Sequence, residues 1–342
     1  MSRYQDEELE RLEERLTALY ANTANEVKAE FTVFIANYKD EIDTMTQKLA
    51  EGEITADEYA NFVRRRVIQT KEYRETVELI TNTLVNTDVL AMALVNNELP
   101  LVIAQSYDFV TSLGFAAADE AGLSVGTFQI YNAESVQQII KNNPEILKEV
   151  YKDKDYSWNR DRINSEITHS LVRGDSIQET AARLQNVTNM DKNAAIRNAR
   201  TAMTAAENLG RTEAAADMRK QGVPIDEVWS ATKDDRTRDT HLLMDGTTRD
   251  KNGEFGAGIV DNPLKFPGDP GGDPEEIYNC RCRLSIVLQG IDHSQDGDLY
   301  EKFMRENYPE DYAKLRANEG EIRKQEQRYA ALQRQADLRA SR

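Results

Sequence analysis

Hydrophobic residues recur at intervals of three and four through the first 50 residues, which is the spacing of one face of an α-helix. Leu9, Leu12 and Leu16 form the start of this line, and the aromatic residues around Phe31 continue it. The period predicts a helix over about residues 5–50. It also fits a coiled-coil seam, but two heptads are too few to require one, and we favour an ordinary amphipathic helix.

Local sequence signals predict where the helices after residue 50 begin and end. Gly52 ends the first pattern, and Thr55 and Glu58 have the spacing of a capping box, so a second helix is expected from Thr55 up to the apolar segment 83–121. This segment is poor in charge and is interrupted by Pro100. We therefore expect two buried helices on either side of the proline, packed against each other or against a partner.

Short elements are predicted over residues 122–156. Two glycines make the start of this segment flexible, Phe128–Tyr131 has the composition of a short strand, and short helices follow. Helix resumes at Trp158 and ends near Gly174, which suits a C-cap. A second capping box at Ser176–Glu179 then opens a helix that is expected to end near residue 185.

An alanine-rich helix is predicted from Asp191 to about Gln221, where Gly222 and Pro224 end it. Beyond it, Val228–Ala231 and Leu284–Leu288 have the pattern of strands, with many Gly, Pro and Asp residues between them. Polar helix returns from about residue 299. The predicted fold is a mostly α-helical N-terminal part followed by a small α+β C-terminal domain with few strands and long loops.

The same changes of composition divide the chain into four expected parts. Residues 1–121 form a helical domain, 122–190 a helical connector, 191–292 the C-terminal α+β domain and 293–342 a polar helical tail. A chain of 342 residues is long enough for such a division.

Composition narrows the cellular setting. The acidic N-terminus has no apolar segment of a signal peptide behind it, and no uncharged apolar run reaches the roughly 18 residues that span a bilayer. We therefore expect assembly in a cytosol, without membrane contact. Two cysteines separated by one residue cannot make a disulfide framework, so reduced thiols are expected.

The net charge of −17 argues against bulk binding to nucleic acid, because phosphate contacts need clustered Lys and Arg. The charge is uneven, since residues 313–342 carry eight basic and four acidic residues. This basic tail could touch DNA or an acidic partner. We favour a solvated helix of mixed charge, so DNA contact has little support.

Charged and special residues concentrate between positions 229 and 283, in a segment rich in turns. They are Trp229, Asp234, Asp235, Arg236, Arg238, His241, Asp245, Gly246, Pro267–Pro270, Asn279, Cys280 and Cys282. An enzyme could use such acids, bases and imidazole for proton transfer. We favour a structural network in which arginines hold loops through carboxylates, with Arg238 and His241, and His241 and Asp245, on shared faces of a helical turn.

Cys280 and Cys282 allow three interpretations. With His241, and with Asp234 or Asp245 as a fourth ligand, they could bind zinc, since thiolate and imidazole are suitable donors. Structural zinc sites usually separate paired cysteines by two to four residues, however, so we favour two buried thiols, which residues on one face of a strand also allow. Redox chemistry is the third interpretation.

Several other activities lack their signatures. A nuclease of the His-Asn-His type needs a second histidine near the first strand, whereas His169 and His293 lie elsewhere. Neither a phosphate-binding loop nor a Gly-x-Ser-x-Gly sequence is present. Asn279 is expected to cap a turn through its side chain.

The ordered motif resembles the C-terminal domain of phage minor head proteins, the family named after the F protein of phage Mu. The resemblance rests on Trp229, the Asp234–His241 segment, Asp245-Gly246, Pro267–Pro270 and Asn279–Cys282, followed by an apolar strand. The helix from residue 198 to 211 also resembles the segment that precedes this motif in the family.

The resemblance implies a structural protein of the phage head rather than an enzyme, with no catalytic residue, metal or cofactor. It implies association with the portal protein and with other capsid or scaffolding proteins. Such a protein would be packaged in the head interior, would be assembled in the host bacterial cytoplasm, and would act in head morphogenesis and in DNA delivery at ejection. The apolar segment 83–118 and the loops of Asp234–Pro270 are the expected recognition surfaces.

Two alternatives stay open at this point. One is a metal- or acid–base-dependent hydrolase built on His241, Asp245, Cys280 and Cys282. The other is a delivery module for a toxin, which would need a further catalytic domain. Only about 50 residues follow the motif in this sequence, and they have the pattern of a polar helix.

Overall fold

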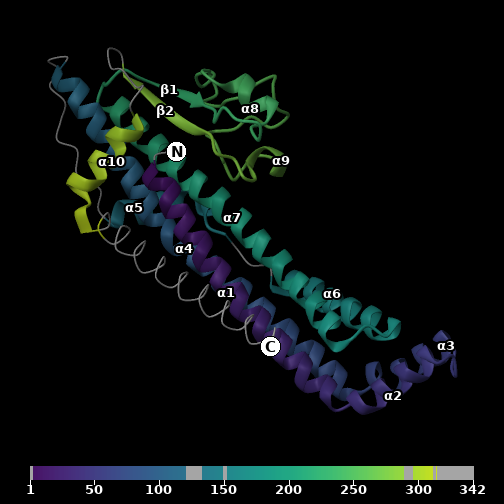
Figure 1. Cartoon of the computed structure of the whole chain (residues 1–342). Coiled ribbons are helices and arrows are strands. Elements are labelled where there is room, and N and C mark those ends of the chain that lie inside the picture. The colour runs from purple at the N-terminus through teal and green to yellow at the C-terminus, as the bar shows by residue number, and fades with distance from the viewer. Residues whose placement is uncertain (1–2, 121–132, 149–151, 289–295, 311–312, 314–342) are drawn as a thin grey trace.

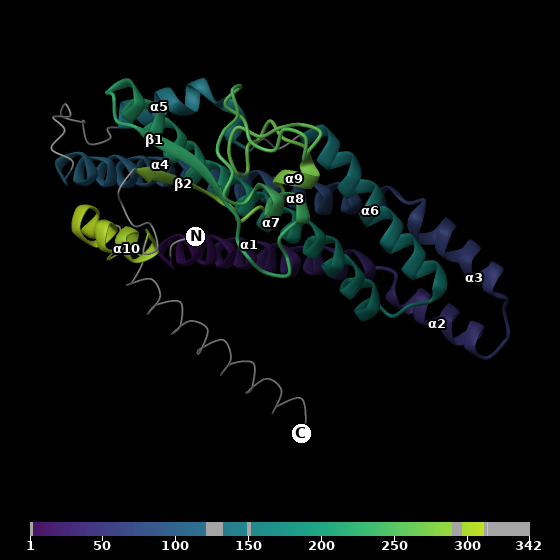
Figure 2. The same ribbon diagram turned by 90° about the horizontal axis from the view of Figure 1, so that it is seen from above.

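Long helices form an elongated bundle with a small sheet and its loops at one end (Figure 1). The computed structural model describes residues 3–120, 133–148, 152–288, 296–310 and 313. Seen from above, the strands and the loops of α8 and α9 lie against one face of the helices (Figure 2). This arrangement confirms the predicted fold class, a mostly helical N-terminal part followed by a small α+β region.

The helices are α1 (Arg3–Ala36), α2 (Lys39–Ala50), α3 (Ala56–Val63), α4 (Lys71–Glu120), α5 (Ala133–Asn142), α6 (Lys152–Arg173), α7 (Ile177–Lys220), α8 (Asp239–Met244), α9 (Pro274–Ile277) and α10 (Asp296–Asn307). A π-helical turn, Arg64–Ile68, follows α3, and a 3-10 turn, Pro144–Ile146, follows α5. The strands are β1 (Ile225–Ser230) and β2 (Arg283–Leu288). The strand predicted at Phe128–Tyr131 lies outside the described residues.

The hydrophobic core runs along α4 and α7, which pack against each other and against α1 and α6. Three groups of buried side chains follow one another from the α2–α3 end to the sheet. They are represented by Phe31, Ile80 and Ile163, by Leu16, Val95 and Ala199, and by Phe109, Met218 and Trp229. The sheet therefore shares a core with the bundle.

The first predicted helix is two helices, α1 and α2, with a turn at Asn37 and Tyr38. No Gly or Pro marks this turn, and the ring of Tyr38 stays buried against Phe34, with centroids 5.3 Å apart. The buried positions of α1 are mostly four residues apart, with fewer spacings of three: Glu8, Leu12, Leu16, Tyr20, Thr23, Val27, Phe31 and Phe34, with Ile35 buried beside Phe34. A left-handed coiled coil needs the two spacings in equal number, so this pattern supports the amphipathic helix.

The capping box at Thr55 is confirmed, since its hydroxyl accepts the N–H of Glu58 at 3.2 Å and the Glu58 carboxylate accepts the N–H of Thr55 at 2.8 Å. The helix does not continue into the apolar segment, because the π-helical turn ends it. Thr70 then caps α4 by accepting the N–H of Tyr73 at 3.1 Å. Its residue type is the usual signal for such a cap.

The prediction of two helices around Pro100 was wrong, because α4 runs through the proline without a break. Proline removes one helical hydrogen bond, to the carbonyl of Asn96, and crowds the preceding turn. Leu99 and Ile103 are fully buried on either side of it. Tertiary packing against α1 and α7 thus keeps the helix continuous through the proline.

Most apolar residues of the part 83–114 are buried or half-buried inside the molecule, which corrects the expected role of this part as a docking surface. Within the described side chains of this segment, Leu90 is the large apolar residue that stays exposed. Lys71–Gly114 has the length and apolar composition of a membrane-spanning helix. Its place between α1, α6 and α7 gives the same composition a role in the protein core.

The capping box at Ser176 is also confirmed, and Gly174 adopts the left-handed conformation, with φ 79°, expected of a C-cap glycine. The helix that it opens does not end near residue 185. It continues as α7 through Asp191 to Lys220, because Val187 and Thr188 are buried and anchor the stretch where a break was expected. Gly222, with φ 84°, follows its end.

The two predicted strands pair antiparallel, with Trp229 opposite Leu284. Helix α7 packs against both strands. Helix α10 belongs to the expected polar tail, yet Met304 is fully buried in the core that contains Trp229. The first helix of the tail therefore completes the core of the C-terminal part.

Candidate functional site

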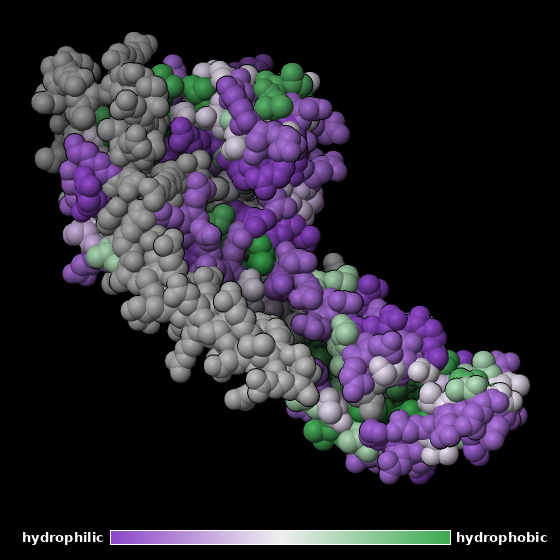
Figure 3. Space-filling model, viewed as in Figure 1, coloured by the Kyte–Doolittle hydropathy of each residue, from purple (hydrophilic) through white to green (hydrophobic). Residues whose placement is uncertain are grey.

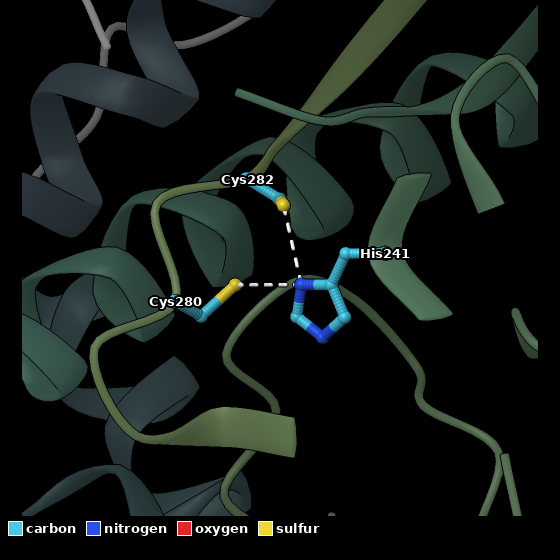
Figure 4. Close-up of side chains that lie close together, drawn as sticks. All are labelled: His241, Cys280 and Cys282. Carbon is cyan, nitrogen blue, oxygen red and sulfur yellow. Dashed lines mark hydrogen bonds between the residues drawn. The ribbon is translucent and has the colours of Figure 1, made fainter. Parts of the chain in front are cut away.

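His241, Cys280 and Cys282 meet in the core beside the sheet. The imidazole Nδ1 lies 3.3 Å from the Cys282 sulfur and 3.7 Å from the Cys280 sulfur, and both sulfurs face the same ring nitrogen (Figure 4). The three residues are 1–3% exposed. Two thiols from one strand end and one imidazole from α8 thus share a single buried pocket of donors.

Trp229 forms the apolar wall of this cluster. Its ring is buried and meets the ring of His241 edge-on, with centroids 5.2 Å apart, and that of Phe255 at 5.5 Å. Its backbone carbonyl accepts the N–H of Gly246 at 2.8 Å. Gly246 has φ 77°, a conformation that favours glycine, so the acidic-Gly turn brings the chain back against β1.

Asp245 does not join the cluster. Helix α8 ends at Met244, so Asp245 leaves the helical face that His241 occupies. Its carboxylate accepts the N–H of Ala231 at 2.9 Å and pairs with Lys233 at 2.8 Å. Burial raises the pKa of Asp245, but these two interactions outweigh it and hold the pKa below its usual range. The acidic neighbour of His241 is instead Glu276, with Oε2 3.0 Å from Nε2.

Asp234 and Arg281 form the bidentate pair that fixes the Cys-Arg-Cys segment, with N–O distances of 2.5 and 2.6 Å. The Arg281 guanidinium holds the pKa of Asp234 well below its usual range, and Asp234 raises the pKa of Arg281 in turn. Asp234 also accepts the N–H of Arg236 at 3.0 Å and the hydroxyl of Thr237 at 3.1 Å. The bidentate partner of Asp234 is thus Arg281, which the sequence had not singled out, rather than Arg236 or Arg238.

The other arginines of the motif face a pocket of about 580 Å³ between α1 and these loops. Arg238 donates to the carbonyl of Tyr278 at 2.5 Å, whereas the side chain of Arg236 is largely exposed. On the bundle side, Arg200 forms a bidentate pair with Glu13 at 2.5 and 2.7 Å. The pocket is lined by Asp6, Leu9, Glu13, Arg200, Thr204, Arg236, Arg238, Tyr278, Asn279, Cys280 and Arg281.

Asn279 acts through its backbone rather than as the side-chain cap that we expected. It has φ 54°, which asparagine tolerates better than most residues, and its N–H donates to the hydroxyl of Thr201 at 3.2 Å. Pro267 contributes its carbonyl, which accepts the amide of Asn208 at 3.0 Å. Both positions therefore tie loops of the motif to α7.

Asn208 is the residue that motif reasoning underrated. It is fully buried on α7, and its amide group donates to the carbonyls of Pro267 and Cys282 and accepts the N–H of Leu284. Thr204, one turn earlier, donates to the carbonyl of Cys280 at 2.8 Å. The available signal was a polar residue on the buried face of an alanine-rich helix. Glu276 was missed as well, although Asp273-Pro274 before it is a helix-start signal.

The ionisation of the two thiols is coupled. The hydrogen bond between them raises the pKa of Cys280, and burial adds to that rise. The same bond, with the contact to His241, lowers the pKa of Cys282. One sulfur is thus favoured as thiolate beside the imidazole, and the other as its proton donor.

Comparison with known proteins shows which family the sequence of this region resembles. Residues 161–285 match the family described as "Phage Mu protein F like protein". The chain is also 24% identical over 293 residues to the minor head protein GP7 of Bacillus phage SPP1, a match that covers 85% of this chain and 86% of GP7. Residues 161–285 therefore contain a Mu F-like domain, and the chain along most of its length is similar to a phage minor head protein.

Two further relatives share only part of their length with this chain. The NAD(+)–arginine ADP-ribosyltransferase EFV of Enterococcus faecalis is 30% identical over 177 residues, which is 51% of this chain and 35% of EFV. The uncharacterized protein YqbB of Bacillus subtilis is 25% identical over 174 residues, 45% of this chain and 56% of YqbB. No solved structure matches the chain.

Proposed function

We propose that this structural head protein is associated with the portal and acts in head morphogenesis and in delivery of DNA at ejection. The match with GP7 carries the proposal, because it covers most of both chains and therefore includes the helical bundle as well as the motif. The protein would assemble in the host bacterial cytoplasm and be packaged in the head interior. The four-part division of the chain remains part of this proposal.

The contact surface proposed for the portal lies on α8. Leu242 and Leu243 are 42% and 66% exposed, although they directly follow the buried His241. Tyr278, 37% exposed, lies at the end of α9. Apolar side chains also gather at the α8 end of the molecule in the space-filling view (Figure 3). Exposed leucines beside a rigid, buried network are suited to docking on another protein.

The test is co-purification of the tagged full chain with the portal protein encoded by the same phage. We expect Leu242→Asp with Leu243→Asp to abolish co-purification, because two charges replace the apolar contact. Leu79→Asp is the matched control, since Leu79 is 47% exposed on α4, away from α8. Equal binding by all three proteins would refute the docking surface, and absence of binding by the wild type would refute portal association.

A second measurement tests the role in the particle. Quantitative mass spectrometry of purified virions should find the protein in a few copies per particle. Particles made without the protein should be tested separately for head assembly and for DNA release into cells. Normal yields of infectious particles without it would overturn both proposed roles.

We propose further that the chain acts without catalysing a reaction. The transferase name belongs to EFV, and 65% of EFV lies outside the match, since the shared part is 35%. Incubation of the pure chain with labelled NAD⁺ and arginine-containing acceptor proteins tests the point directly. Transfer of label above that of heat-denatured protein would show an enzyme and refute the purely structural role.

A further inference from the structure

The donors of the His241 cluster have the separations that one tetrahedral metal ion requires. With metal–sulfur bonds of about 2.3 Å and metal–nitrogen bonds of about 2.0 Å, nitrogen and sulfur ligands stand about 3.5 Å apart. The Nδ1–Sγ distances of 3.3 and 3.7 Å bracket that value, and all three donor atoms lie within 4.8 Å of one another. Both sulfurs approach the same nitrogen, so a single ion can bind all three.

The far side of the imidazole has the partner that a metal-bound histidine usually has. Oε2 of Glu276 lies 3.0 Å from Nε2 and also accepts the hydroxyl of Thr240 at 2.9 Å. The contact is close but not aligned as a hydrogen bond, since Nε2 has no such partner among the described residues. When Nδ1 gives up its proton to bind an ion, a carboxylate there favours the proton on Nε2, and the lone pair of Nδ1 then faces the space between the sulfurs.

The backbone around the two cysteines is fixed in advance. The carbonyl of Cys280 is held by Thr204, that of Arg281 by Thr232 at 2.7 Å, and that of Cys282 by Asn208 at 3.2 Å. Three consecutive peptides are therefore anchored to α7 and to the loop after β1. Such support keeps the two cysteine ligands within the narrow geometry that metal binding needs.

The short cysteine spacing is no obstacle in this fold. Cys280 and Cys282 are two residues apart just before β2, where alternate side chains share a face. The third donor comes from α8, so no second cysteine pair is required. Among the described residues no other His, Cys, Asp or Glu joins the three, so they supply three ligands.

We propose that His241, Cys280 and Cys282 bind one zinc ion that ties α8 to the start of β2. Thiolate and imidazole ligands suit zinc, whereas Mg²⁺ and Ca²⁺ prefer oxygen ligands. The site has a stabilising role. Zinc binds the folded chain but not the unfolded chain, and it therefore shifts the folding equilibrium toward the folded state. The inference does not depend on the association with the portal.

The first test is the metal content of the full chain, purified without chelator and reconstituted with zinc under reducing conditions. We expect one zinc per chain by mass spectrometry of the elements, and a fall in melting temperature on chelation. Replacement with cobalt should give the visible bands of a tetrahedral ion and the near-ultraviolet band of thiolate-to-cobalt charge transfer. A folded, reduced chain that holds no zinc and shows no such band would overturn the proposal.

Variants separate the site from core packing. His241→Ala and Cys280→Ser should each lose the zinc, whereas Met244→Leu, a change of similar volume in the same core, should keep it. If the donor variants fail to fold, the cobalt spectrum of the wild type still decides the question. Equal zinc content in Cys280→Ser and in Met244→Leu would show that the ion binds elsewhere and that the cluster is only a pair of thiols bonded to a neutral imidazole.

Discussion

The side-chain oxygen of Asn208 accepts a hydrogen bond from the backbone N–H of Leu284 at 2.6 Å. This bond joins the middle of α7 to β2, opposite Trp229 on β1. The amide of Asn208 continues the link to Pro267 and Cys282, so one buried side chain holds three separate segments of the Mu F-like domain.

Asn208→Ala should therefore lower the free energy of unfolding by roughly 3 kcal/mol, because it leaves several buried backbone groups without partners. Urea denaturation followed by circular dichroism measures the loss. Asn186→Ala is the control, since Asn186 is exposed on the same helix. A loss no larger than that of the control would contradict the central role of Asn208.

Gly210 lies where the backbone of α7 approaches that of α4 closely. A Cβ atom at this position would lie 2.4 Å from the backbone carbonyl oxygen of Ile103. Alanine gains up to about 1 kcal/mol in helix propensity over glycine, but moving two packed helices apart costs about 1–3 kcal/mol. Gly210→Ala should thus lower the melting temperature.

Gly114→Ala is the comparison for that variant, because its Cβ would meet only the flexible end of the Met218 side chain. We expect it to be tolerated better than Gly210→Ala. The reverse order of melting temperatures would show that the backbone contact with Ile103 does not limit the packing.

Met304 tests whether α10 belongs to the core. Met304→Ala should cost about 2–5 kcal/mol, as do other deletions of large buried side chains. Lys302→Ala, at an exposed position of the same helix, should leave the melting temperature nearly unchanged. If both variants melt like the wild type, the helix contributes no stability.

Buried carboxylates in the bundle should make its stability depend on pH. Burial raises the pKa of Asp191 to about 8, and the nearby Asp88 and Asp155 add to the rise. Burial also raises the pKa of Asp88 to about 6, although Tyr20 donates to it at 2.6 Å. The folded state thus holds protons that the unfolded chain releases near pH 4.

Stability should then be greatest below pH 4 as far as these groups contribute, and should fall as pH rises toward 8. Asp191→Asn should raise the melting temperature at pH 8 and flatten its decline between about pH 4, the pKa of an unfolded carboxyl group, and pH 8, the pKa of Asp191 in the folded state. Asp161→Asn, exposed on α6, should leave the slope of the wild type. An unchanged slope in Asp191→Asn would refute the assignment.

Local signals predicted the ends of elements well. The capping boxes at Thr55 and Ser176 and the glycine at Gly174 depend on neighbours in the sequence, and they were confirmed. The continuity of α4 through Pro100 and of α7 through Asp191 depends on long-range packing, which no local pattern contains. Periodicity also missed the turn at Tyr38, which the aromatic contact with Phe34 stabilises.

In the candidate site, too, local sequence predicted some features and long-range contacts decided the others. The sequence motif singled out His241, Cys280 and Cys282 but paired the histidine with Asp245, as helical spacing suggests. Because α8 ends one residue earlier, the carboxylate beside the imidazole is Glu276, from the separate helix α9. Contacts between segments distant in sequence decided the arrangement, and no local pattern could predict them.

The shared core of the sheet and the bundle has a consequence for genetic exchange among phages. The strands β1 and β2 cannot bury their inner face alone, since Asn208 and the alanines of α7 form its other side. The family match begins at residue 161, within α6, and so includes the whole of α7. Recombination that transplanted the strands and motif loops without α7 would yield an insoluble fragment, so the helix and the motif must be inherited together.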